Sequence, residues 1–305
     1  MSLRAVKQII ETTPTIEGAG VKLQRAFGFG KTKEFDPFLL LDDFRNENPA
    51  DYLAGFPWHP HRGIETITYV LAGEVEHGDS LGNKGKMGAG DVQWMTAGSG
   101  ILHQEMPRGD QHGRMHGFQL WANLPAALKM TAPRYQDIPS SAIPEVTEDD
   151  GTRARVICGD FWGTQGPVSG VATESSVAAR YVDISVPPGK RKRIQVETTR
   201  NAFAYVFAGA GAFRDASAPQ AVLTESGVDP NAPAVYDAKN HSLVLFDQGD
   251  EIVVQAGPDG IRFLLVSGQP LEEPVAWYGP IVMNTQAELR QAMSELQTGK
   301  FIRHS

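Results

Sequence analysis

The chain has 305 residues, of which 41% are hydrophobic and 21% charged, a length and composition that favour two domains each burying its own core. The formal net charge of −8 argues against direct nucleic-acid binding, and no apolar run approaches the roughly 18 residues of a membrane-spanning helix. Cys158 is the single cysteine and the start of the chain lacks the apolar core of a signal peptide, so we expect a cytoplasmic protein.

Short runs of β-branched and aromatic residues recur along the chain between glycines and prolines. This pattern is typical of many short strands joined by turns, and alternation within the runs predicts one inward face for each strand. The expected fold class is therefore all-β. Clear examples of such strands are residues 21–27, 65–71, 91–95 and 116–121.

An internal similarity indicates how the strands are divided. Residues 68–73, Thr-Tyr-Val-Leu-Ala-Gly, are echoed by residues 204–209, Ala-Tyr-Val-Phe-Ala-Gly, each a strand running into a glycine turn. We expect two related antiparallel barrels. The proline-containing and acidic stretch 133–151 is predicted to be a linker, between an N-terminal barrel at 1–132 and a C-terminal barrel at 152–305.

One convincing helix is predicted near the C-terminus. Thr285 and Glu288 have the spacing of a capping box, and Leu289, Met293 and Leu296 then recur at helical spacing. A short helix with one apolar face should pack on the outside of a barrel.

The first chemical motif is Trp-His-Pro-His-Arg-Gly at residues 58–63. His59 and His61 are two residues apart in an expected strand, so both side chains point to the same, inward face. Pro60 points the other way and cannot donate a ladder hydrogen bond, which places the pair at a strand end near a barrel mouth.

A second pair follows about forty residues later. His103 and Glu105 share a strand face and come after Gly98 and Gly100, which permit a close backbone approach. Three imidazoles and one carboxylate suit a borderline divalent metal, and an octahedral iron(II) site would keep about two open positions. Zinc stays an alternative, although four ligands would saturate a tetrahedral zinc.

These motifs closely resemble the pirin family of the cupin superfamily. The resemblance implies a bicupin, with two jelly-roll barrels and one iron in the N-terminal barrel, held by His59, His61, His103 and Glu105. Manganese, nickel and copper, like zinc, are alternative ions. The segments that carry the resemblance are residues 59–66, 90–98 and 100–105, with 38–44 upstream and 273–280 near the end.

The carboxylate ligand has a competitor in Glu65. In the wider cupin pattern the carboxylate comes from the first motif, and Glu65 has the same strand parity as His61. The pirin-like choice is Glu105, which would leave Glu65 as a buried acceptor that orients a ligand or binds backbone.

The second barrel is expected to lack a metal. Aligning the two repeats places Gln195 and Glu197 at the positions of His59 and His61, and aligning the later strands places Val254 and Ala256 opposite His103 and Glu105. Because apolar side chains cannot ligate a metal, the C-terminal barrel is predicted to be structural or regulatory.

The resemblance implies a quercetin 2,3-dioxygenase-like enzyme that opens the heterocycle of flavonols with O2. Glu105 would act as the catalytic base, with a flavonol and O2 as partners. Aromatic and methionine residues near the motifs are candidates for the pocket wall: Phe56, Trp58, Trp94 and Met95. The alternative is a non-enzymatic, iron-binding regulatory protein that acts through protein partners, because the same four ligands would serve both roles.

Overall fold

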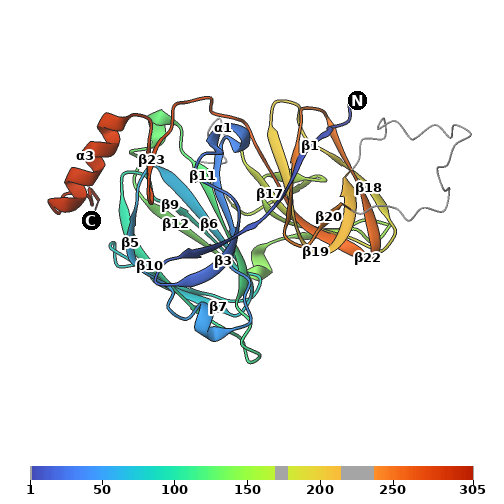
Figure 1. The fold of residues 1–305 in the computed structure, drawn as a ribbon, viewed down its shortest axis with the longest axis horizontal. Coiled ribbons are helices and arrows are strands. Elements are labelled where there is room, and N and C mark those ends of the chain that lie inside the picture. The colour runs from blue at the N-terminus through green and yellow to red at the C-terminus, as the bar shows by residue number, and fades with distance from the viewer. Residues whose placement is uncertain (1, 169–177, 214–236, 305) are drawn as a thin grey trace, which may run out of the picture.

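The computed structural model describes residues 2–168, 178–213 and 237–304, which form two β-rich halves lying side by side (Figure 1). Two antiparallel sheets that enclose a pocket build the N-terminal half, and a larger sheet curls around an apolar core in the other. The predicted all-β class and two-part architecture are confirmed. None of the helices in these ranges is long and apolar enough to cross a membrane.

The larger N-terminal sheet separates the pocket from the C-terminal half. Its strands alternate between the two faces, so that Thr68 points into the pocket while Ile67 and Tyr69 point into the core between the halves. The sheet has the order β12-β9-β6-β11-β4-β3-β2, with β2 (Thr13–Glu17), β3 (Val21–Phe27), β4 (Phe38–Asp43), β6 (Ile64–Ala72), β9 (Val92–Thr96), β11 (His116–Asn123) and β12 (Arg134–Ile138).

The smaller N-terminal sheet forms the opposite wall of the pocket and carries both histidine-containing motifs. Its order is β5-β10-β7-β8, with β5 (Phe56–His61), β7 (Glu74–Asp79), β8 (Lys84–Met87) and β10 (Ile101–Arg108). Short helical elements lie in the connections: α1 (Thr32–Phe35) and three 3-10 turns at 49–51, 126–128 and 140–142.

The C-terminal half is filled with apolar side chains. Val254 and Ala256, which the sequence comparison placed opposite His103 and Glu105, are fully buried in this core. A two-stranded ribbon of β15 (Asp160–Phe161) and β16 (Thr164–Gln165) accompanies the main sheet. The main sheet contains β1 (Val6–Glu11), β13 (Glu145–Thr147), β14 (Arg153–Cys158), β17 (Arg180–Val186), β18 (Arg191–Gln195), β19 (Asn201–Phe213), β20 (Ala238–Lys239), β21 (Ser242–Phe246) and β22 (Glu251–Gly268).

Both ends of the chain cross to the opposite half. Strand β1 pairs with β21 of the C-terminal sheet, while β23 (Ala276–Tyr278), β24 (Ile281–Met283) and α3 (Gln286–Gln297) lie against the N-terminal half (Figure 1). The predicted linker also contains β12, which pairs with β9. The proposed boundaries at 132 and 152 therefore do not coincide with the edges of the sheets.

The predicted C-terminal helix and internal repeat are both confirmed. Helix α3 begins at the capping box formed by Thr285 and Glu288. The repeated segments lie at equivalent places, in β6 and β19, and each runs into a glycine with positive φ, 80° at Gly73 and 66° at Gly209.

Candidate metal centre

Two neighbouring strands bring the predicted ligands together. His59 and His61 lie on β5, His103 and Glu105 lie on β10, and His103 is the register partner of His59. The antiparallel pairing of β5 with β10 therefore brings the three histidines together.

The hydrogen bonds of the first pair fix which ring nitrogens carry protons. His59 Nδ1 lies 2.9 Å from Pro57 O and His61 Nδ1 lies 3.1 Å from Pro280 O. A carbonyl oxygen can only accept, so both Nδ1 atoms donate and both Nε2 atoms present lone pairs. These two Nε2 atoms face each other at 3.1 Å with no proton to share between them.

A cation bound between the two nitrogens would remove this repulsion. Two nitrogens bound at about 2.1 Å and at right angles to one ion lie about 3.0 Å apart, which matches the observed separation. His103 completes the group: the candidate ligand atoms of His59, His61 and His103 all lie within 4.8 Å of one another. Both ring nitrogens of His103 are buried without a hydrogen-bond partner, and a metal ion would satisfy one of them.

Burial keeps the three imidazoles in the form that ligates. Desolvation lowers the pKa of His59, and it lowers the pKa values of His61 and His103 well below their usual range, an effect reinforced by the neighbouring rings. Neutral imidazole is the metal-binding species. The three-histidine cluster is thus suited to hold a divalent metal ion.

Glu105 lies on the same strand but turns toward the larger sheet. Among the described residues the group of mutually close ligand atoms contains the three histidines and not Glu105. Its Oε1 accepts a 3.0 Å hydrogen bond from Thr68, and β10 has a register irregularity between His103 and Glu105. Burial raises the pKa of Glu105 to about 7, although the Thr68 hydroxyl opposes the shift. Ligation of the metal by Glu105 stays a prediction.

Glu65 is placed elsewhere. It lies in β6 of the other sheet, and its carboxylate accepts hydrogen bonds from Trp94 Nε1 at 2.9 Å and Thr96 Oγ1 at 2.6 Å. Glu65 is an even number of residues from His61 but does not lie with the histidines. The chain turns at Gly63, with φ of 79°, and passes from one sheet to the other. Glu65 is instead a fully buried hydrogen-bond acceptor.

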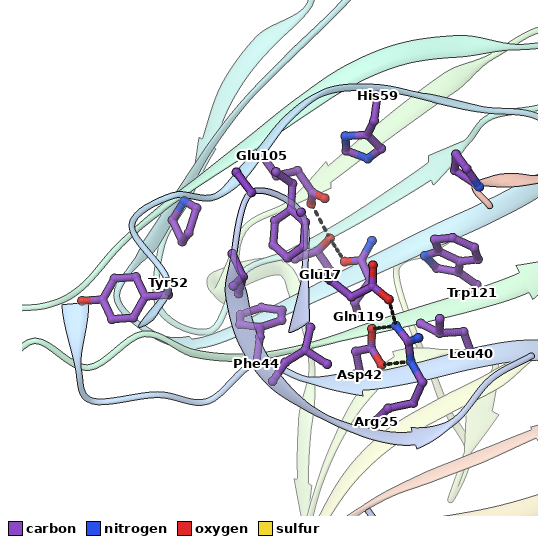
Figure 2. A pocket seen from close by; sticks show the side chains of 18 of the residues that line it. Glu17, Arg25, Leu40, Asp42, Phe44, Tyr52, His59, Glu105, Gln119 and Trp121 are labelled. Carbon is purple, nitrogen blue, oxygen red and sulfur yellow. Dashed lines mark hydrogen bonds and ion pairs between the residues drawn. The ribbon is translucent and has the colours of Figure 1, made fainter. Parts of the chain in front are cut away.

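A cavity of about 670 Å³ lies between the two N-terminal sheets, and His59 and His61 line it (Figure 2). Of the aromatic candidates, Phe56 lines it, whereas Trp58 is 54% exposed and Trp94 and Met95 lie in the buried cores. Several lining residues could not be predicted from the sequence because they come from distant strands: Leu40, Gln119, Trp121 and Trp277.

Comparison with known proteins identifies the family. A family model described as Pirin matches residues 20–122, and one described as Pirin C-terminal cupin domain matches residues 181–302. A Pirin-like protein of Caulobacter vibrioides is 43% identical over 99% of this chain and 100% of its own length. A Pirin-like protein of Solanum lycopersicum is 40% identical over 93% of this chain and 88% of its own.

A solved structure has the same fold as this chain. The crystal structure of a quercetin 2,3-dioxygenase from Acinetobacter baumannii is 30% identical, with a TM-score of 0.84, and the match covers 98% of this chain and 99% of that one. The expected bicupin architecture is thereby confirmed. The two family models together match more than half of the chain, and the Caulobacter relative matches nearly all of it, so the chain belongs to the pirin family.

Proposed function

We propose that this protein is an iron-dependent dioxygenase that opens the heterocycle of flavonols such as quercetin, inserting both atoms of O2 and releasing one ring carbon as carbon monoxide. The observation that carries the proposal is the cluster of three neutral histidines, two of which, His59 and His61, line a cavity of about 670 Å³ whose other side chains are largely apolar and aromatic. A cavity of this size suits a small aromatic molecule. The A. baumannii structure, named for this activity, supports the same reaction class.

The donor set fits iron(II), held by His59, His61 and His103 with Glu105 as the fourth ligand we propose. When bound, the ion would supply a Lewis-acidic centre with open positions for oxygen ligands. The protein's own contribution is to keep the imidazoles neutral and oriented. Burial keeps the rings neutral, and Pro57 O and Pro280 O orient His59 and His61 by accepting their Nδ1 protons.

Glu105 is the residue we assign to proton transfer. Glu105 lines the cavity and is 7% exposed, and without a metal burial raises its pKa to about 7 (Figure 2). It can therefore accept the proton of a flavonol hydroxyl when its bond to the metal loosens. Thr68 holds Oε1 in place at 3.0 Å.

Trp121 offers a hydrogen-bond donor beside the histidines. Its ring contacts His61 edge-on, with centroids 5.0 Å apart, and its buried Nε1 has no hydrogen-bond partner. A substrate oxygen close to the metal would satisfy this N–H. Phe56 and Leu40 add apolar surface to the same cavity.

The direct test is anaerobic reconstitution with iron(II), followed by oxygen uptake and product analysis with quercetin. We expect turnover and carbon monoxide release by the wild type and their loss in His61→Ala and Glu105→Ala. His112→Ala, on an exposed turn, is the matched control and should keep the activity.

Elemental analysis of protein purified without added metal would identify the resident ion. Iron would favour oxygen chemistry, whereas zinc alone would favour a structural or sensing site. Stoichiometric metal with no oxygen uptake would contradict the enzymatic proposal and favour the alternative, an iron-binding regulatory protein acting through protein partners.

A further inference from the structure

A row of polar side chains crosses the cavity face of the seven-stranded sheet. Thr68 of β6 is the register partner of Gln119 in β11, Gln119 is the partner of Asp42 in β4, and Asp42 is the partner of Arg25 in β3. Directly opposed residues of neighbouring strands share one face, so these four side chains form a continuous line. All four line the cavity.

A hydrogen bond links one end of this polar row to the proposed base, and an ion pair links the other end to a partly exposed carboxylate (Figure 2). Thr68 Oγ1 lies 3.0 Å from Glu105 Oε1 and 2.6 Å from Gln119 Oε1. Arg25 donates to both oxygens of Asp42, at 2.8 and 2.7 Å. Arg25 also pairs with Glu17 of β2 at 2.9 Å, and the Glu17 side chain is 41% exposed.

Apart from the histidines and Glu105, the charged residues of the described cavity lining all lie at the far end of the row: Asp42, Arg25 and Glu17. Its charge is net negative, because Asp42 and Glu17 contribute two carboxylates against the single guanidinium of Arg25. Each carboxylate oxygen can accept more than one hydrogen bond, so the pairs with Arg25 leave acceptor capacity. A neutral hydroxyl group is the partner that such a site prefers.

The surroundings make this end selective. The neighbouring wall is apolar, from Val21, Leu23 and Phe44, and the hydroxyl of Tyr52 is already bonded to Gly113 O. A hydroxyl reaching this end of the cavity therefore finds its acceptors on Asp42 and Glu17. A bare aromatic edge in the same place would leave partly desolvated carboxylates without a new partner.

We infer that Asp42 and Glu17 recognise hydroxyl groups on the part of the substrate farthest from the metal, so that the cavity selects flat aromatic molecules hydroxylated at both ends. The inference rests on the proposed function, since the metal end must bind the other oxygens of the same molecule. It assigns substrate selection to strands β2 and β4, which carry none of the predicted metal ligands.

The test uses three flavonols that differ only in their pendant ring: galangin with no hydroxyl there, kaempferol with one and quercetin with two. Binding to the protein loaded with iron(II) is measured without oxygen by quenching of tryptophan fluorescence, because Trp121 and Trp277 line the cavity. We expect wild type to bind quercetin about tenfold more tightly than galangin, the size of an effect that hydrogen bonds to charged groups produce.

Glu17→Gln and Asp42→Asn should each reduce that preference to about threefold or less while galangin binding changes little. Glu17→Gln is the safer variant for folding because the side chain is partly exposed. Glu76→Gln, which removes an exposed carboxylate paired with Arg108 outside the cavity, is the matched control and should keep the full preference.

Equal wild-type affinity for the three flavonols, binding of none of them, or an unchanged preference in both variants would overturn the inference. Oxygen uptake, measured separately in air, keeps the two proposals apart. Selective binding without uptake would sustain the recognition of hydroxyl groups and refute the dioxygenase. Oxygen uptake with equal affinity for all three flavonols would support the dioxygenase and refute the recognition of hydroxyl groups.

Discussion

The protonation of two imidazoles follows from two backbone carbonyls. Because Pro57 O and Pro280 O can only accept, the Nδ1 atoms of His59 and His61 are donors and their Nε2 lone pairs face each other at 3.1 Å. Pro280 comes from the segment between β23 and β24, more than two hundred residues along the chain. The C-terminal segment thus orients a proposed ligand carried by the N-terminal half.

Replacing a central histidine should abolish metal binding without unfolding the protein. In His61→Ala we expect the metal content, read by elemental analysis after reconstitution, to fall from about one ion per chain to near zero, since removing one of few ligands sharply lowers affinity. Circular dichroism should show the wild-type β signal. Wild-type metal content in this variant would exclude His61 as a ligand.

The two buried glutamates should respond differently to substitution. Glu65→Gln should keep the metal but lower the free energy of unfolding by about 1–3 kcal/mol, because the carboxylate that accepts from Trp94 and Thr96 is lost. Glu105→Gln should weaken metal affinity with a smaller cost in stability. Metal titration and urea unfolding of both variants measure these effects. Loss of metal in Glu65→Gln but not in Glu105→Gln would identify Glu65 as the carboxylate ligand.

Local pattern predicted the histidine cluster but only part of the cavity. His59 and His61 share a face because they are two residues apart in one strand, and this needs no knowledge of the fold. Trp121 and Trp277 could not be placed in the same way, because their position at the cavity depends on which distant strands pair. Counting alternate residues predicts a shared face only within one strand. It fails for Glu65 because the turn at Gly63 separates Glu65 from the strand of His61.

At the scale of the elements, the C-terminal helix α3 is bound next to β5, the strand that carries His59 and His61. Arg62, directly after His61, donates to Glu295 of α3 at 2.7 Å and to Phe301 O at 2.8 Å, and its guanidinium stacks 4.2 Å from the Phe301 ring centroid. The capping box predicted where α3 begins, because it is a local signal. The docking site of α3 was not predictable, since it depends on a partner more than two hundred residues away.

This attachment should weaken in acid. Burial opposes ionisation of Glu295, but hydrogen bonds from Gln291, Arg62 and Arg303 lower its pKa from 4.5 to about 2. Because the pKa of Glu295 is lower in the folded state than in the unfolded state, its ionised carboxylate stabilises the folded protein above about pH 4.5. This stabilisation is lost as the pH falls toward about 2.

Glu295→Gln should therefore lower the free energy of unfolding by about 1 kcal/mol at pH 7, with a difference from wild type that shrinks between about pH 4.5 and pH 2. Urea unfolding at several pH values measures it. Glu74→Gln, which removes a surface carboxylate paired with Lys86, serves as the control. A difference that stays constant over this interval would contradict the role of Glu295.

At the scale of the whole molecule, one sheet serves both the cavity and the contact between halves. Thr68 and Gln119 face the cavity, while their strand neighbours Tyr69 and Phe118 belong to the core shared with the C-terminal half. Packing between the halves therefore supports the wall that carries the polar row. The exchange of chain ends, with β1 on one half and α3 on the other, ties the two halves together further.

The repeated tyrosines make reciprocal contacts across this junction. Tyr69 of the first half donates to Asp183 of the second at 2.8 Å, and Tyr205 of the second donates to Asp43 of the first at 2.7 Å. Each aspartate is also paired with an arginine of its own half, Arg262 for Asp183 and Arg45 for Asp43. The Tyr-Val similarity in the sequence thus marks a pseudo-symmetric interface as well as two related strands.

Tyr69→Phe and Tyr205→Phe should each destabilise the protein by about 1–2 kcal/mol in urea unfolding, because each leaves a buried aspartate short of one donor. Tyr181→Phe is the matched control: its ring is buried in the same core but its hydroxyl has no hydrogen-bond partner, so its removal should cost little. Similar losses for Tyr69 and Tyr205 would confirm that the two contacts are equivalent. Losses no larger than that of Tyr181→Phe would show that these two hydrogen bonds do not stabilise the contact between the halves.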